Sequence, residues 1–145
     1  MIALIQRVNW AEVTVNAQSI GKIQHGILAL MAVEKGDTEA STQKMIDKII
    51  NYRIFSDEQG KMNLSLLDMQ GELLLVSQFT LLANTDKGRR PSFSDSPDPA
   101  MSEALFEYSI GYAKTLVNKV EQGQFAADMK VSLENDGPVT FWLKV

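Results

Sequence analysis

The sequence of 145 residues contains no cysteine, one histidine and four prolines. Without cysteine, the chain has no disulfide framework, no thiol nucleophile and no zinc–thiolate site. The histidine, His25, stands beside Gly26 at a predicted turn. A Ser-His-Asp triad would have to use it, yet no nucleophile stands near it at suitable spacing, and we interpret it as a surface residue. Since carboxylates are not clustered at ligand spacing either, we expect no metal and no cofactor.

Long apolar runs and a surplus of positive charge are also absent. No stretch reaches the roughly 18 apolar residues that a membrane span needs, and residues 1–15 alternate in polarity, unlike a signal peptide. We therefore expect a soluble, cytoplasmic protein without a membrane partner. The net charge of −4 disfavours wrapping a nucleic-acid duplex such as DNA, so a nucleic-acid partner would be held at a small site such as a strand end.

The length and the hydrophobic fraction of 45% predict one globular domain over residues 1–145. Strands are predicted at residues 2–7, 11–15, 20–24, 27–33 and 53–55. A first helix is predicted over residues 38–51. A second helix is predicted to begin at Asp98, with Pro99 at its first position, and to end before Gly123. The buried stripes predicted for the two helices are Met45, Ile46, Ile49 and Ile50, and then Ala104, Leu105, Tyr108, Tyr112, Leu116, Val117 and Val120.

Residues 72–84 form the stretch around which the chain is organised. A continuous apolar run at residues 73–76 is typical of a strand that is buried on both faces. Ser77, Gln78 and Thr80 interrupt it before Leu81 and Leu82 resume. A buried hydroxyl or amide without a partner costs roughly 1–3 kcal/mol, so these groups either bond to neighbouring backbone or meet a ligand.

A second stretch, residues 135–140, separates two alternating segments that we predict to be the last two strands, and residues 135–138 are predicted to connect them. Gly137-Pro138 suits a hairpin turn, because proline fixes φ and removes a donor. Glycine also allows a ligand to approach closely, and carbonyl groups aimed in parallel would recognise an ammonium group. The residues alone leave both interpretations open. Together the elements predict an α+β domain with largely antiparallel sheets and two main helices.

The available chemistry is hydroxyls, one amide and backbone donors, which could hydrolyse an already activated ester by holding its oxyanion. A lone threonine without an adjacent base is a poor nucleophile. A hydroxyl group of the substrate could take that role instead.

At these two stretches the chain resembles the D-aminoacyl-tRNA deacylases, the family once called D-tyrosyl-tRNA deacylases. Ser77-Gln78-Phe79-Thr80 matches one signature motif, and Asn135-Asp136-Gly137-Pro138-Val139-Thr140 matches the other. Neither motif contains a departure. The resemblance covers the full length, since it extends to residues 1–8, 52–57, 90–94 and 125–129.

The resemblance implies a barrel-like core and a homodimer that hydrolyses the ester between a D-amino acid, or glycine, and the terminal adenosine of tRNA. In the family the Gly-Pro bond is cis and enters the other subunit's pocket, where it rejects L-amino acids and turns its carbonyls toward the α-ammonium group. Gly137 and Pro138 would thus be a chirality filter in trans. Ser77, Gln78, Phe79 and Thr80 would line the ester-binding pocket as its catalytic residues.

Three questions and one further prediction remain at this point. Either Thr80 or the ribose 2′-hydroxyl of the tRNA drives the reaction, and the lack of a base near Thr80 favours the RNA. The basic loop with Lys87, Arg89 and Arg90 is predicted to bind tRNA phosphates. Phe125 and Met129 either wall the pocket or belong to the core. The alternatives to an esterase are a non-catalytic module that binds RNA ends and a structural dimer.

Overall fold

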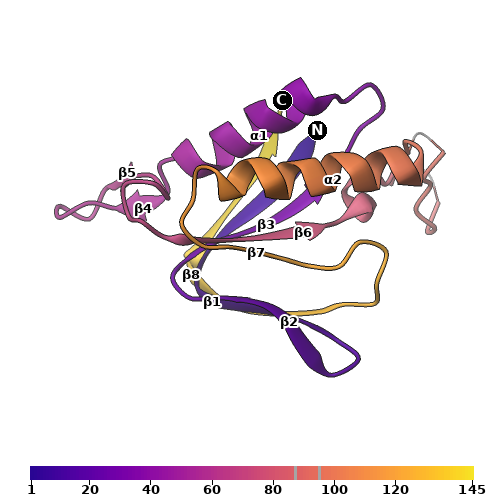
Figure 1. The fold of residues 1–145 in the computed structure, drawn as a ribbon. Helices are drawn as coiled ribbons and strands as arrows, with labels where there is room; N and C mark the ends of the chain where they lie inside the picture. The colour runs from indigo at the N-terminus through magenta and orange to yellow at the C-terminus, as the bar shows by residue number, and fades with distance from the viewer. Residues whose placement is uncertain (87, 95) are drawn as a thin grey trace.

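The computed structural model describes residues 1–86, 88–94 and 96–145 (Figure 1). One mixed sheet contains β1 (Ile2–Val15), β2 (Gln18–Ile23), β3 (Gly26–Ala32), β6 (Glu72–Ser77), β7 (Val120–Gln122) and β8 (Lys130–Lys144). A separate ribbon pairs β4 (Phe55–Ser56) with β5 (Met62–Leu64). The helices are α1 (Glu39–Asn51), α2 (Pro99–Lys114) and the 3-10 helix η1 (Phe79–Leu82). None of the helices in these residues is long and apolar enough to cross a membrane.

The sheet runs in the order β2-β1-β3-β6-β7, and β8 also pairs with β1. β1 is antiparallel to β2, β3 and β8, whereas β3, β6 and β7 run parallel to one another. The sheet curls until its two ends approach. A Cβ added at Gly21 in β2 would lie only 2.6 Å from the Gln122 carbonyl oxygen of β7. The α+β class with a nearly closed, barrel-like sheet and two α-helices is therefore confirmed.

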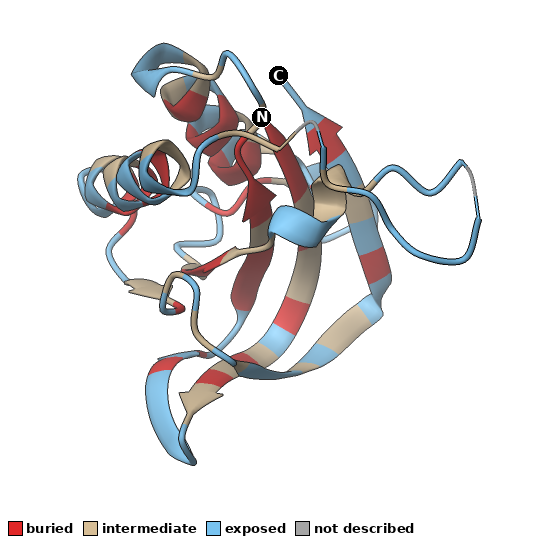
Figure 2. Cartoon of the chain, turned by 90° about the vertical axis from the view of Figure 1, so that its right-hand side faces the viewer, coloured by how far each residue is buried: buried red, intermediate tan, exposed pale blue. Residues whose placement is uncertain are grey.

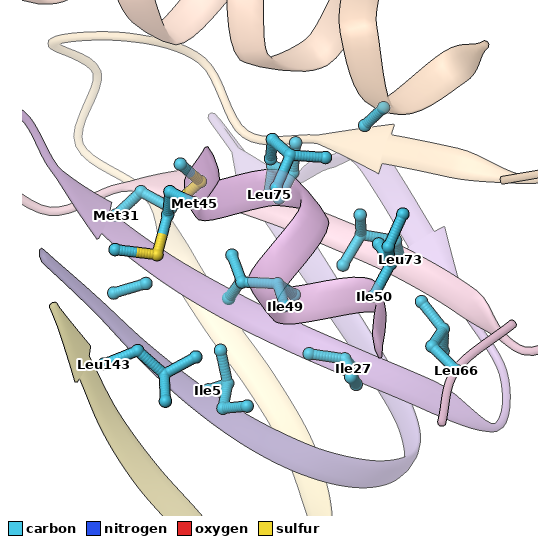
Figure 3. Close-up of a cluster of buried hydrophobic side chains, with 14 of the residues drawn as sticks. Ile5, Ile27, Met31, Met45, Ile49, Ile50, Leu66, Leu73, Leu75 and Leu143 are labelled. Atoms are coloured by element: carbon cyan, nitrogen blue, oxygen red, sulfur yellow. The ribbon is translucent and has the colours of Figure 1, made fainter. Parts of the chain in front are cut away.

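Two apolar clusters hold this sheet. The larger one lies between the sheet and the two helices (Figure 3), and the smaller one lies inside the curl around Val8, Leu28 and Val76. The predicted stripe of α1 is confirmed, because Met45, Ile46, Ile49 and Ile50 are all buried. Full burial of such a side chain stabilises the fold by about 1.5–3 kcal/mol. Figure 2 shows the buried residues gathered along the strands beneath the helices.

The second helix begins as predicted, but it ends earlier and buries a different face. The Asp98 carboxylate accepts hydrogen bonds from the Ala100 and Met101 N–H groups at 2.8 and 3.2 Å, which caps the helix. The helix ends at Lys114, and the segment predicted as its last turns contains β7. The residues of α2 that are buried are Leu105, Phe106, Ser109, Ile110 and Ala113.

The predicted stripe was therefore partly wrong, and the hydrogen bonds of two tyrosines explain why. Tyr112 donates to the Asp47 carboxylate of α1 at 3.0 Å, and the Tyr108 hydroxyl accepts from the Gln43 amide. Both rings therefore lie at the rim between the helices, half-buried, because their polar tips need partners. Ala104 and Leu116 are exposed.

Three strand predictions were also wrong. Residues 2–7 and 11–15 belong to one strand, β1, and the last two predicted strands form one strand, β8, that pairs with β1 along nearly its whole length. Residues 135–138 are a bulge inside β8 and not a connection between strands. The ribbon strand β4 begins at Phe55, two residues later than predicted, because it pairs with β5 at Phe55–Leu64.

Candidate active site

A pocket of about 600 Å³ lies where the three parallel strands end. β3 contributes Met31 and Ala32, β6 contributes Val76 and Ser77, and the segment that follows β7 contributes Phe125. Ligands of α/β sheets bind outside the carboxyl ends of parallel strands, because the chain must leave the sheet there and exposes backbone groups. The position of the pocket follows from the sheet topology.

The stretch at residues 72–84 is a buried strand only up to Ser77. Ser77 pairs with Met31 of β3, and the Gln78 N–H donates to the Met31 carbonyl at 2.7 Å. β3 ends one residue later, at Ala32, so β6 has no neighbour to extend along. The chain turns into η1, so the polar residues that interrupt the apolar run lie at the end of the strand and in this helical turn.

This turn places three of the four predicted catalytic residues in the pocket wall. Ser77, Gln78 and Phe79 line the pocket, whereas Thr80 is exposed beside it. The Gln78 side-chain amide donates a hydrogen bond to Thr80 Oγ. In the described part of the chain no carboxylate or imidazole bonds to that hydroxyl, so nothing there would activate it as a nucleophile. The N–H groups of Phe79 and Thr80 lie at the start of η1, where an N–H has no acceptor within the helix.

The rest of the wall is largely apolar. Phe125 and Met129 both line the pocket, and the Phe125 ring packs on Phe106 with centroids 6.4 Å apart. Both also pack against the buried clusters, so the two interpretations of these residues are compatible. Among the described lining residues, Asp128 is the only acidic or basic side chain, and it is exposed and pairs with Lys130 at 2.8 Å. The site therefore offers hydroxyls, one amide and backbone donors, but no acid–base pair.

Among the pocket residues that the sequence did not predict, Ser96 and Met1 carry polar groups. Ser96 lies before the α2 cap, and its Oγ is buried with no hydrogen-bond partner within the described residues. Met1 walls the pocket, and its ammonium group donates to the Glu34 and Asp37 carboxylates at 2.9 Å each. Burial would raise the pKa of Glu34, but hydrogen bonds from Lys144 and from this ammonium group hold the pKa below its ordinary value. No periodicity marks either residue, since one lies in a loop and the other precedes the first strand.

The Gly137-Pro138 corner lies away from this pocket. The peptide bond between the two residues is cis, and both are exposed. Neither is among the residues that line the pocket of the same chain. Val131, which does line it, precedes Gly137 by six residues of β8, or about 20 Å of extended strand. In the structure of one chain, residues 77–79 therefore line the pocket, whereas Gly137 and Pro138 do not.

The corner is a bulge that β1 holds in place. Between the pairs Val8↔Asn135 and Gln6↔Thr140, β8 advances from residue 135 to 140 while β1 moves only from 8 to 6. Arg7 Nε donates to the Asp136 carbonyl at 2.9 Å and lies 3.0 Å from its carboxylate. A Cβ on Gly137 would lie 2.5 Å from the Val139 nitrogen, so only glycine fits there.

Arg7 and the Asn135 side chain are functional candidates to which the sequence assigned no role, although Asn135 belongs to the second motif. The Asn135 amide group donates to Gln6, to the Val139 carbonyl and to Thr140 at 3.1–3.2 Å, and its oxygen accepts the Val139 N–H at 2.6 Å. The available signal was the pair Gln6-Arg7, two polar residues inside an otherwise apolar strand segment.

The basic loop and the histidine occupy different ends of the molecule. Arg89 and Arg90 are exposed in a loop whose base is closed by backbone hydrogen bonds between Asn84 and Ser92 at 2.9 and 3.1 Å. Lys87, predicted to act with them, lies outside the described residues. His25 is exposed, as predicted, with its ring 5.3 Å from that of Phe55. It precedes the Gly26↔Glu72 pair, at the ends of β3 and β6 that are remote from the pocket.

Comparison with known proteins identifies relatives over the whole chain. The family model described as D-Tyr-tRNA(Tyr) deacylase matches residues 4–144. A D-aminoacyl-tRNA deacylase of Haemophilus influenzae (strain PittEE) is 58% identical over 145 residues, and one of Actinobacillus pleuropneumoniae serotype 5b (strain L20) is 55% identical; each match covers 100% of both chains.

Solved structures agree with these matches. A structure of the c-Myc DNA Unwinding Element Binding Protein superposes with a TM-score of 0.94 at 36% identity, covering 100% of this chain and 99% of that chain. A probable eukaryotic D-amino acid tRNA deacylase superposes with a TM-score of 0.86 at 15% identity, covering 99% and 98% of the two chains, and this second likeness supports the fold alone.

Proposed function

The chain belongs to the D-Tyr-tRNA(Tyr) deacylase family, and on that premise we propose that it hydrolyses the ester between a D-amino acid and the terminal adenosine of tRNA. The observation that carries the proposal is the Ser77–Phe79 wall of a pocket whose described lining residues include no acid–base pair. An aminoacyl ester is activated, so hydrogen-bond donors that hold its oxyanion are sufficient catalytic equipment. A tRNA substrate also assigns the activity to the cytoplasm.

In the proposed reaction, water attacks the carbonyl carbon of the ester. Negative charge develops on the carbonyl oxygen, where the N–H groups of Phe79 and Thr80 stabilise it; one such donor is worth about 2.7–4 kcal/mol in known cases. The bond between the carbonyl carbon and the ribose oxygen then breaks, and the proton from water passes to that oxygen. The products are the free D-amino acid and tRNA.

We assign the proton transfer to the ribose 2′-hydroxyl group and not to Thr80. The Thr80 oxygen accepts a hydrogen bond from the Gln78 amide, and a side-chain amide cannot take up a proton from it. The 2′-hydroxyl is adjacent to the reacting ester in every aminoacyl-tRNA. A substrate that ends in 2′-deoxyadenosine should therefore react much more slowly, whereas Thr80→Val should retain most of the activity.

The chirality filter requires a second copy of the chain. The Gly137-Pro138 corner does not line its own pocket, so to meet the substrate it has to enter the pocket of a partner subunit in a homodimer. Its carbonyl groups would accept hydrogen bonds from the α-ammonium group, and the side chain of an L-amino acid would collide with the corner. Glycine has no side chain to exclude, so glycyl-tRNA should also be hydrolysed.

We propose that Arg89 and Arg90, together with Lys87, bind phosphates of the tRNA. Both arginines are exposed on a loop whose flanking residues Leu82 and Ser96 line the pocket, and the chain as a whole is acidic. Binding at one basic loop would restrict contact to the end of the tRNA, where the ester lies.

Matched D-tyrosyl-tRNA and L-tyrosyl-tRNA provide the test. Release of tyrosine from each is followed with purified protein. Fast release from the D ester with near-background release from the L ester is expected. Equal rates for the D and L esters would show an esterase that lacks the chirality filter. No release from either ester would show that Ser77 and Thr80 serve only in binding.

A further inference from the structure

Phe79 is exposed to an extent unusual for a large aromatic side chain. Its exposed fraction is 61%, although it belongs to the pocket wall. Burying a phenylalanine would stabilise the fold by about 1.5–3 kcal/mol, so an aromatic ring left open at a pocket mouth indicates a binding surface. The ring is not isolated: its centroid lies 5.1 Å from that of Phe93, with 55° between the planes.

Phe93 extends this aromatic surface out of the pocket. It does not line the pocket itself, so the pair leads from the pocket mouth, at Phe79, to the surface beyond it. Phe93 directly follows Ser92, which closes the base of the loop that carries Arg89 and Arg90. Figure 2 shows this loop as an exposed segment that projects from the molecule. The aromatic pair and the two arginines thus follow one another along the surface that leads away from the pocket.

This combination fits one class of ligand. Single-stranded nucleic acids are bound where aromatic side chains stack on unpaired bases and basic side chains contact the phosphates between them. The positive charge of Arg89 and Arg90 on the same loop attracts a polyanion such as a nucleic-acid backbone. A duplex would not suit the surface, because its bases are stacked on one another.

We propose that the Phe79–Phe93 pair is a stacking platform for an unpaired base of the substrate RNA, immediately upstream of the terminal adenosine. The inference rests on the proposed function and adds a subsite that begins at the mouth of the ester pocket. Arg89 and Arg90 then contact the phosphates that lead to this base. The platform accepts any base, because every base has a π face.

The test compares three D-tyrosyl esters that end in the same adenosine: the nucleoside, a trinucleotide and whole tRNA. For the wild-type protein, kcat/KM should rise when nucleotides are added to the nucleoside. Phe93→Ala should lower kcat/KM by about tenfold on the trinucleotide and the tRNA and leave hydrolysis of the nucleoside ester nearly unchanged. Phe93→Tyr, which keeps the stacking face, should retain wild-type values on all three.

Three results would overturn the platform. The first is an equal loss on all three esters, which would make Phe93 a support of the pocket. The second is no gain from added nucleotides in the wild-type protein. The third is dissociation of a wild-type dimer by Phe93→Ala in sedimentation, which would make the pair a contact between two copies.

A binding measurement separates this inference from the proposed function. A non-hydrolysable trinucleotide with 2-aminopurine next to the terminal adenosine should lose fluorescence on binding to the wild-type protein, and less so with Phe93→Ala. If no ester is hydrolysed, the proposed function fails while quenching still supports the platform. If esters are hydrolysed but quenching is the same for both proteins, only the platform fails.

Discussion

Replacing Arg7 with leucine tests how strongly the Gly137-Pro138 corner depends on the strand beneath it. The arginine side chain is only 11% exposed and donates to two carbonyl groups, that of Asp136 at 2.9 Å and that of Ile54 at 2.7 Å. Leucine retains part of the apolar stem but none of the donors. The two carbonyl groups lose a charged partner, and the corner is no longer tied to β1 by this side chain.

The expected loss of stability follows from these bonds. A hydrogen bond to a charged group contributes about 1.5–3 kcal/mol, which gives roughly 3–6 kcal/mol for two. The lower end applies here, since Asp136 is 40% exposed and water can replace its partner. A loss of about 3 kcal/mol in the free energy of unfolding corresponds to a Tm lower by roughly 6–12 °C for a domain of this size.

Two assays separate the stability effect from the effect on function. The Tm of Arg7→Leu is measured by calorimetry, and the ratio of kcat/KM for D- and L-tyrosyl-tRNA is measured well below that Tm. We expect the ratio to fall at least about tenfold, which corresponds to 1.4 kcal/mol of lost discrimination. Arg53→Leu is the matched control, because Arg53 is exposed and bonds only to Asn63, at 3.2 Å, among the described residues.

The reasoning about Arg7 would be refuted by a Tm within about 2 °C of the wild type, since the two carbonyl groups would then have found other partners. A normal ratio of D to L rates in a destabilised variant would show that the corner does not depend on Arg7 for its function. Arg7→Lys keeps the charge but cannot reach both carbonyls with one fork, so it should behave more like Arg7→Leu than like the wild type.

Three further predictions concern the corner, the acid range and the basic loop. Pro138→Ala should reduce D/L discrimination more than it reduces Tm, because Pro138 is exposed; intact selectivity would argue against the filter. Burial would raise the pKa of Glu72, but hydrogen bonds from Lys119 and the Gln24 N–H hold the pKa below its ordinary 4.5. The carboxyl group of Glu72 therefore binds a proton more readily in the unfolded chain than in the folded chain. Its contribution to the free energy of unfolding is complete above pH 4.5 and is lost as the pH falls through the lowered pKa. Glu72→Gln should accordingly lower Tm at pH 7 by more than at pH 3, and a constant difference in thermal scans would contradict this. Arg89→Glu with Arg90→Glu should weaken tRNA binding and flatten its logarithmic salt dependence by about 0.7 for each phosphate that the variant no longer binds, whereas unchanged binding at low salt would exclude phosphate binding by these arginines.

The sequence predicted those parts of the fold that depend on local signals. The apolar stripe of α1 and the cap of α2 at Asp98 depend on residues a few positions apart, so periodicity and capping chemistry were sufficient. The end of α2 was misjudged because Val120 continues an apolar spacing that a helix could use. Pairing with Leu73 on a remote strand assigns that residue to β7, and a local pattern does not contain this information.

The candidate site divides in the same way. The motif at residues 77–80 was found because polar groups follow a buried run, and three of its four residues line the pocket. The 135–138 segment was interpreted as a turn because Asn-Asp-Gly-Pro has ordinary turn chemistry. The chain does not reverse at this segment, because the residues before and after the bulge both pair with β1. Arg7 bonds to residues that are remote in the sequence, and Ser96 lies in a loop without periodicity, so neither residue was assigned a role from the sequence.

The bulge also determines which residues of the last strand face the interior. Odd-numbered residues face the interior on both sides of it, with Leu133 before the corner and Val139 and Leu143 after it. Side chains of a strand alternate with a period of two, so removal of one residue from the corner would turn Leu143 outward and Lys144 inward. The number of residues in the corner is thus as constrained as their identity. Only insertion or deletion of an even number of residues would keep Leu143 facing the interior.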